Sequence, residues 1–437
     1  MERPVSHLGA GRHVVLILAL LALIVASNSF VGGFYPNRIS PLHFSTIPDV
    51  VEAVALTLCA LPLFILARFS FGYVIGLWLY AMVAGFIFLS YSTKLEYDHS
   101  QARISALLCL ISFLIPALFL RLNVRSFSVT PRTMNLLMVC ALIASGIVAA
   151  ACAMYGFRLG GLLQTLAMRD EVTRPRLLNY LSGIVSGAVL PFCFAYYAVN
   201  RRWILCAVAA ALLLSFFPML LSKTVLMAPA WLVFLFVLYT AFDPKTATAV
   251  SMIVPTVLGA AIYFLGSSLF PGSSLGLYAI TYLNLRMIAT PSIALDHYFA
   301  FFSNHPHTYF CQINVVQLFA GCPYTEQLGV ILKHEYDLGN FNGSLFTTEG
   351  IASVGPVLAP IATFVCGIII GLANIASSRL SPTLVAVSSG VLVQALTNVP
   401  LSTVLLSNGG AVLFMLWLVS PRCKGLAAEP SRDSPAE

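Results

Sequence analysis

The segment from Arg158 to Arg176 gathers arginine on a chain that carries little charge elsewhere. Arg169, Arg174 and Arg176 lie within the sequence MRDEVTRPRLLNY, beside two acidic residues. Arginine suits phosphate and carboxylate because its planar fork forms paired hydrogen bonds with them. The spacing favours an anion-binding segment. A solvated helix start with local ion pairs is the alternative interpretation.

Two further basic residues stand in apolar surroundings. Lys223 belongs to the short Ser222-Lys223-Thr224 turn, and Arg286 belongs to the sequence NLRMIATP. The lysine could meet a lipid phosphate as a point charge, or simply extend its amine to the headgroups. The arginine needs a partner because desolvated charge is expensive. That partner would be a phospholipid headgroup or a bound substrate.

Glu349, in the sequence FNGSLFTTEGIASVG, is an acid at the start of an apolar run. A carboxylate placed there could act as a general base, which contributes about 10²–10⁴-fold to a rate. The alternative is structural, because a carboxylate in the first turn of a helix interacts with free backbone N–H groups. Two weaker candidates are Asp296 with His297 as an acid–base pair, and Glu335 with Asp337 as ligands of a divalent metal.

Several signatures of other chemistry are absent from the sequence. It contains no GxxxxGK[ST] phosphate loop and no HExxH pair, which argues against an ATP-driven motor and against a zinc protease of that type. It has no CxxC and no Cys/His spacing typical of a metal site. We therefore expect neither a metal nor another cofactor.

The elements that must position these residues are membrane-spanning helices. Apolar residues make up 59% of the 437 residues and charged residues 9%, and the mean hydropathy is +0.91. Backbone inside lipid must hydrogen-bond to itself, so the spans are helices. We predict one all-α polytopic membrane domain over 1–437. At about 20 apolar residues a span, about twelve segments qualify: 14–31, 48–67, 71–91, 104–120, 134–155, 179–199, 204–221, 224–241, 248–267, 350–373, 383–398 and 403–420.

The charges of the loops indicate the orientation. With the N-terminus inside, the inner loops hold most of the 23 basic residues, whereas the large outer loop, 268–348, holds only Arg286 and Lys333. The positive-inside rule then places both termini in the cytoplasm. The tail, 421–437, is polar and expected to be disordered. The inner basic residues are Arg3, Arg12, Arg68, Arg121, Arg125, Arg132, Arg201, Arg202, Lys245, Arg379, Arg422, Lys424 and Arg432.

The large outer loop is expected to carry two short helices at the membrane interface. The stretches 275–285 and 292–303 are rich in apolar and aromatic residues, and Pro291 separates them. Plain anchoring by aromatic residues is the alternative role. Cys311 and Cys322 are the two cysteines of this loop. An oxidising exterior would allow them to form a disulfide, and two free thiols are the alternative.

Three elements together resemble the bacterial oligosaccharide repeat-unit polymerases, the Wzy-type O-antigen polymerase family. They are SKTVLMAPAWLVFLF, NLRMIATPSIALDHYFAFFS, and the stretch 342–355, in which Glu349 and Gly355 lie six residues apart. Departures are visible: Arg176 has a glycine at the expected distance, Gly187, but Arg286 has none. Residues 351–354 also replace the aromatic-rich stretch that usually follows the Glu.

The resemblance implies a metal-independent membrane glycosyltransferase with a GT-C-like bundle and a periplasmic outer loop, in the bacterial inner membrane. It would join oligosaccharide repeat units carried on undecaprenyl diphosphate into O-antigen or exopolysaccharide. Its partners would be the lipid-linked oligosaccharide, membrane lipids and a chain-length regulator, with no nucleic acid. Developing charge on the leaving diphosphate calls for fixed positive donors. The residues expected to bind the diphosphate are Arg169, Arg174, Arg176, Lys223 and Arg286.

In the same scheme Glu349 is the candidate base, and Tyr298, Phe301 and Phe302 stack on sugars or line a lipid groove. Two alternatives share part of this pattern. An O-antigen ligase uses the same donor but a different acceptor, and usually carries a histidine where this chain has Glu349. A flippase or transporter would carry charge along several spans, and the predicted spans have almost none away from their outer ends.

Overall fold

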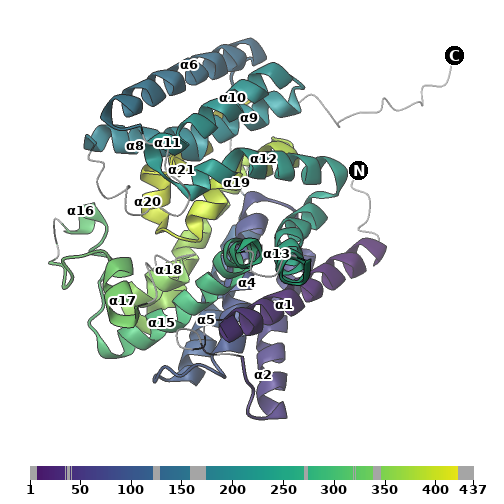
Figure 1. Ribbon diagram of the computed structural model, residues 1–437, viewed down its shortest axis with the longest axis vertical. Coiled ribbons are helices and arrows are strands. Elements are labelled where there is room, and N and C mark those ends of the chain that lie inside the picture. The colour runs from purple at the N-terminus through teal and green to yellow at the C-terminus, as the bar shows by residue number, and fades with distance from the viewer. Residues whose placement is uncertain are drawn as a thin grey trace.

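The computed structural model describes residues 7–34, 36, 40, 42–121, 128–157, 174–269, 274–317, 319, 321–337 and 346–421. Throughout these ranges every regular element is a helix (Figure 1). Ten helical stretches within them are long and apolar enough to cross a membrane. The prediction of an all-α, multi-pass membrane protein is therefore confirmed at this level. Arg158, Arg169 and the tail 422–437 lie outside the described residues.

The helices of the first half follow one another with short connections. They are α1 (His7–Phe34), α2 (Ile47–Leu58), α3 (Leu61–Leu66), α4 (Phe71–Leu89), α5 (His99–Phe119), α6 (Pro131–Tyr155), α8 (Arg176–Ile184), the π-helix η1 (Val185–Val189), α9 (Leu190–Val199), α10 (Trp203–Ser215) and α11 (Phe217–Leu220).

The second half contains the longest helix and the outer elements. Its helices are α12 (Lys223–Ala241), α13 (Pro244–Leu269), α14 (Leu275–Ala279), the π-helix η2 (Ile280–Ala289), α15 (Thr290–Asn304), α16 (Asn314–Gln317), α17 (Leu328–Tyr336), α18 (Thr347–Ser377), α19 (Pro382–Leu396), α20 (Leu401–Leu406) and α21 (Gly410–Val419).

Helix α4 forms the core of the bundle and is buried along its whole length. Its sequence is apolar on every side, which is typical of a helix with neighbours all round. Ser70 caps its start by accepting a 3.1 Å hydrogen bond from the N–H of Tyr73. Helices α1, α5, α15 and α18 contact it, and Figure 1 shows it among them.

Loops that the charge pattern assigns to the inner side contact one another. Arg12, at the start of α1, forms an ion pair with Asp243, between α12 and α13. The N–H of Val129, before α6, donates a 3.0 Å hydrogen bond to the carbonyl of Val419, at the end of α21. These contacts place the assigned loops on one face of the bundle.

The last two predicted spans differ from the structure. Segment 383–398 is the 15-residue helix α19, and segment 403–420 is broken into α20 and α21. The break falls at Ser407-Asn408-Gly409, where Gly409 has a φ of 81°. Glycine adopts this left-handed conformation without the steric cost of a side chain. Ten long stretches and two shorter helices thus replace the predicted twelve uniform spans.

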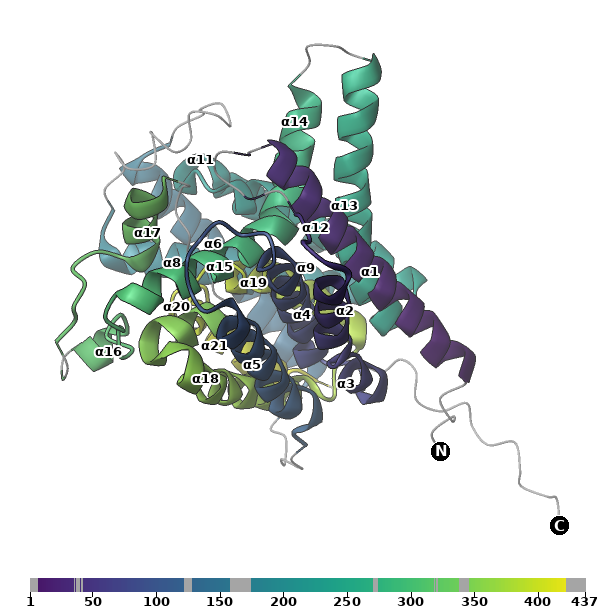
Figure 2. The same ribbon diagram turned by 90° about the horizontal axis from the view of Figure 1, so that it is seen from below.

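The outer stretch also differs from the expected pair of separate interfacial helices. Helices α14, η2 and α15 form one continuous run, and Pro291 lies in the first turn of α15 instead of ending a helix. Residues 291–302 are all buried. Helices α13 and α14 pair and extend beyond the rest of the bundle (Figure 2). The outer run is therefore part of the core at α15 and exposed at α14.

Candidate functional site

Two of the predicted basic residues meet at the turn between α11 and α12. Leu221 makes this turn with a left-handed φ of 49°, after which Ser222 and Lys223 begin α12. A guanidinium nitrogen of Arg174 donates to the carbonyl of Met219, in α11. Residue 174 lies far from this turn in the sequence, so the fold brings the arginine segment and the SKT turn together.

A third basic residue approaches the same turn from the outer run. The Nζ of Lys223 donates a 2.6 Å hydrogen bond to the hydroxyl of Tyr282, in η2. Arg286 lies four positions further along this π-helix and is exposed. A π-helix closes its hydrogen bonds over five residues, so residues four apart lie on nearly the same side. Arg286 therefore lies one turn from the tyrosine that binds Lys223.

The start of α12 adds backbone donors to these side chains. Ser222 precedes the helix without a capping hydrogen bond from its side chain. The first N–H groups of a helix point outward and favour anions. We define the basic cluster as Arg174, Lys223 and Arg286 around this turn. Arg176, at the start of α8, is exposed two residues beyond Arg174.

Helix α18 reverses direction at Gly355. This residue has a φ of 77° and non-helical backbone inside the helix. A Cβ on Gly350 would lie 3.1 Å from the carbonyl oxygen of Ala359, although a straight helix would separate these residues by about 13 Å at 1.5 Å per residue. The short arm, 347–354, therefore folds back against the long arm, 356–377.

This reversal places Glu349 inside the protein. Its carboxylate is buried and accepts a 3.2 Å hydrogen bond from the N–H of Leu401, the first residue of α20. Phe346, just before the short arm, stacks on Phe113 of α5 with ring centroids 4.8 Å apart. Glu349 thus lies on a re-entrant arm within the bundle, deeper than the helix start where the sequence pattern places it.

The three predicted aromatic residues lie beside this arm and are buried. Burial raises the pKa of Tyr298, and the nearby carboxylate of Glu349 raises it further. The Phe302 ring lies 6.0 Å from the Tyr298 ring, and Phe301 stacks on His305 at 3.9 Å. Their faces contact other protein rings, so in this state they pack beside Glu349 and present little surface to a ligand.

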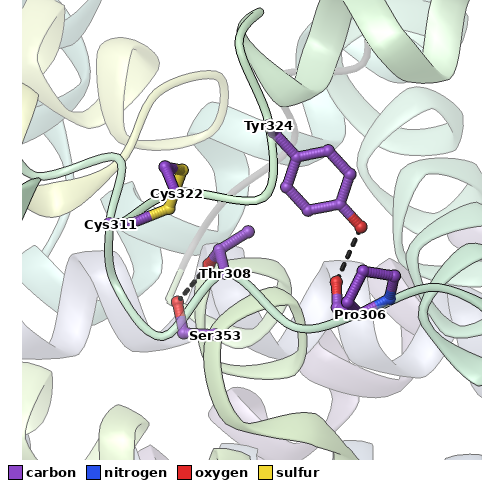
Figure 3. Close-up of a disulfide and its surroundings, with 6 residues drawn as sticks. All are labelled: Pro306, Thr308, Cys311, Cys322, Tyr324 and Ser353. Atoms are coloured by element: carbon purple, nitrogen blue, oxygen red, sulfur yellow. Dashed lines mark hydrogen bonds between the residues drawn. A yellow bond between two sulfur atoms is a disulfide. The ribbon is translucent and has the colours of Figure 1, made fainter. Parts of the chain in front are cut away.

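Cys311 and Cys322 are joined by a disulfide, with Cα atoms 5.3 Å apart (Figure 3). The loop that they close lies between the end of α15 and the short arm of α18. Thr308 and Ser353 approach each other beneath it, with hydroxyl oxygens 3.2 Å apart. The outer loop is therefore fastened to the element that carries Glu349.

A buried carboxylate cluster surrounds Asp296, which we considered only as half of an acid–base pair. Its oxygens accept hydrogen bonds from the hydroxyls of Thr93, at 2.8 Å, and of Tyr97. Tyr97 also stacks on His99 at 4.3 Å. Burial raises the pKa of Asp296, although the charge of His297 and the two hydroxyl donors lower it.

Sequence reasoning missed this cluster because its members come from two distant segments. The hydrogen-bond partners of Asp296 lie 203 and 199 residues away along the chain. Aspartate inside an aromatic run was the one available signal, since a charge there must be partnered. For Glu335 and Asp337, no His/Cys/Asp/Glu group able to hold a metal occurs among the described residues.

A short helix separates the basic cluster from Glu349. The first residue of α20, Leu401, binds Glu349. Just beyond its other end, the carbonyl of Ser407 faces Gly183 of α8, the helix that Arg176 begins. Six residues span about 9 Å at 1.5 Å per residue. Within the described ranges no ion pair joins Glu349 to the basic cluster, so a ligand would have to reach across α20.

The placement of these side chains can be summarised chemically. A basic surface with free helix N–H groups lies at one face, and a buried acid lies a short helix away on a re-entrant arm. Together they could hold a phosphorylated ligand and accept a proton from a hydroxyl. No protein-family model, curated protein or solved structure matches this chain.

Proposed function

We propose that the chain is a membrane glycosyltransferase that polymerises oligosaccharide repeat units carried on undecaprenyl diphosphate at the periplasmic face of the inner membrane. The observation that supports this most directly is the convergence of Arg174, Lys223 and Arg286 at the α11–α12 turn. Charge-assisted hydrogen bonds from such groups are about twice as strong as neutral ones. A diphosphate leaving group requires this kind of fixed positive charge.

In the proposed reaction a hydroxyl of the incoming repeat unit attacks the anomeric carbon of the growing chain. The new glycosidic C–O bond forms as the bond to the diphosphate breaks. Undecaprenyl diphosphate leaves with the electron pair, and the basic cluster stabilises its charge. Glu349 accepts the hydroxyl proton, and apolar surfaces of the bundle accommodate the lipid tail.

Glu349→Gln tests the acid directly. Glutamine retains an oxygen that can accept the hydrogen bond from Leu401, so the packing of α20 survives while the base is lost. With a defined undecaprenyl-diphosphate oligosaccharide, we expect polymer formation to fall about 10²- to 10⁴-fold at normal protein abundance. Glu335→Gln, at an exposed position on α17, is the matched control and should be active. Normal chain lengths from Glu349→Gln would remove it as the base.

Products of a deletion strain separate the alternatives. A polymerase deletion leaves one repeat unit on the acceptor, whereas loss of every unit indicates a ligase or a flippase. Arg286→Lys and Arg174→Lys add a second criterion, because lysine cannot form the paired hydrogen bonds of arginine. Full activity of both lysine variants would contradict bidentate binding of the diphosphate.

A further inference from the structure

The short arm of α18 ends where the helix cannot satisfy its own carbonyl groups. In an uninterrupted helix the carbonyl of Ala352 would accept from the residue four positions later. That residue is Pro356, which has no N–H. The turn at Gly355 also interrupts the regular pattern that would serve Ser353. Buried carbonyl groups need donors, so another segment must supply them.

The loop after α15 supplies both donors. The N–H of Thr308 donates to the carbonyl of Ala352 at 2.8 Å, and the N–H of Tyr309 donates to the carbonyl of Ser353 at 3.0 Å. The hydroxyls of Thr308 and Ser353 add a contact of 3.2 Å (Figure 3). The loop therefore closes the end of the short arm one helical turn beyond Glu349.

The loop is held in this conformation by its own contacts. The disulfide between Cys311 and Cys322 closes it on one side, and the Tyr324 hydroxyl donates to the carbonyl of Pro306 at 2.6 Å on the other (Figure 3). Tyr309 has a φ of 48°, a left-handed value that residues with side chains rarely adopt. Such backbone persists only where the surroundings hold it.

The short arm has no slack at the turn itself. A Cβ on Gly355 would lie 2.8 Å from the Nε2 of His307, the residue before Thr308. The loop thus contacts the arm at three successive positions, 307 to 309. We define residues 306–311 with the bonded Cys322 as the clasp.

We propose that Thr308 is a positioning residue for Glu349 and that the disulfide keeps the clasp closed. This inference rests on the proposed function. When a dithiol reductant supplies two electrons and two protons, the disulfide becomes two thiols and the reductant becomes a disulfide. The clasp then opens, the two carbonyl groups lose their donors, and the arm no longer holds Glu349 at the acceptor hydroxyl.

The experiment compares oxidised and reduced full-length protein in two assays. Hydrogen exchange of the amides in 347–354, measured without substrate, should become about tenfold faster on reduction, while exchange in α4 stays unchanged. In the assay with undecaprenyl-diphosphate oligosaccharide, kcat should fall about 10- to 100-fold because misplaced catalytic groups cost this much. The KM for the lipid-linked donor should remain constant, since the basic cluster is untouched.

Variants identify the disulfide as the cause. Cys311→Ser/Cys322→Ser should behave as the reduced protein and ignore the reductant. Cys59→Ser/Cys140→Ser, at two exposed free cysteines, should respond as the unmodified chain does. Thr308→Ala should lower kcat about 2- to 10-fold through loss of one hydroxyl contact, and Thr308→Ser should restore it.

The outcomes separate this inference from the function on which it rests. Equal exchange of the short arm in both redox states would overturn the clasp. Faster exchange with an unchanged kcat would overturn positioning of Glu349. Faster exchange in a protein that forms no glycosidic bond in either state would overturn the proposed function and support the clasp as the device that orders the arm.

Discussion

The ammonium group of Lys223 is bound to the hydroxyl of Tyr282 at 2.6 Å and lies 4.9 Å from the centre of its ring. Lys223 is the first residue of α12, whereas Tyr282 belongs to η2, 59 residues later. The contact joins the SKT turn to the helix that carries Arg286. Lys223 is half-buried, so tyrosine holds its charge in place with donors still available to an anion.

Lys223→Ala should weaken use of the lipid-linked donor. Loss of one charged hydrogen bond to the diphosphate costs about 1.5–3 kcal/mol, so kcat/KM should fall about 10- to 100-fold. Tyr282→Phe retains the ring and should have a smaller effect. Lys333→Ala, at an exposed lysine on α17, is the control. Steady-state kinetics with the reconstituted protein measure all three, and equal values for Lys223→Ala and Lys333→Ala would contradict a diphosphate role.

Gly355→Ala should destabilise the protein and disturb Glu349. Its φ of 77° is strained for any residue with a side chain, and the new Cβ would meet the ring of His307. A residue held in such backbone costs about 1–3 kcal/mol. The thermal unfolding midpoint in detergent should therefore fall.

Gly146→Ala provides the matched control for this glycine. Gly146 lies within α6, where a Cβ would meet nothing within 4 Å. Alanine in a helix is favoured over glycine by about 1 kcal/mol, so its midpoint should stay constant or rise. A Gly355→Ala protein as stable as Gly146→Ala would show that the reversal in α18 is absent in solution.

Local patterns were sufficient to predict the helices. Phe71–Leu89 is a run of apolar residues between Ser70 and Ser90, and the structure forms α4 over that run. The reversal of α18 also had a local signal, because Gly355-Pro356 is a dipeptide typical of turns. It was read as part of one span because proline is common in membrane helices.

Contacts between distant segments could not be predicted from periodicity. Nothing near Lys223 in the sequence specifies Tyr282, and nothing near Glu349 specifies Leu401, 52 residues later. These pairs depend on which helix faces pack together. The candidate site was therefore predicted as a set of residue types, whereas its division into a basic cluster and a buried acid on either side of α20 required the structure.

Arg103 provides a test of which interaction stabilises the outer end of α5. Its guanidinium carbon lies 4.1 Å from the centre of the Tyr91 ring, and its Nε lies 3.6 Å from a carboxylate oxygen of Glu52. Arg103 is buried but the side chain of Glu52 is 53% exposed. Exposed ion pairs contribute about 0–1 kcal/mol, whereas a desolvated cation–π contact contributes about 2 kcal/mol.

Tyr91→Leu should therefore lower the unfolding midpoint more than Glu52→Gln does. Tyr91→Phe retains the ring and should behave nearly as the unmodified chain. Detergent-solubilised protein and a thermal unfolding assay are sufficient for the comparison. If Glu52→Gln were the more destabilising change, the ion pair and not the aromatic ring would hold Arg103.

Asp296 should make the stability of the protein fall as the pH rises. Burial raises the pKa of its carboxyl above the ordinary value of 3.8. Above about pH 4 the unfolded chain therefore releases this proton while the folded chain retains it. The folded state then binds more protons, and the free energy of unfolding decreases with pH until the raised pKa is passed.

Asp296→Asn removes this titration while keeping an oxygen that can accept from Tyr97 or Thr93. Its unfolding midpoint should change less between pH 4.5 and 8, a range chosen to begin about half a unit above the ordinary carboxyl pKa, than that of the unmodified chain. Glu326→Gln, at an exposed acid in the outer loop, should preserve the original slope. Parallel curves for Asp296→Asn and the unmodified chain would mean that the folded and unfolded states hold this proton equally, and the hydroxyls of Tyr97 and Thr93 would then offset the effect of burial.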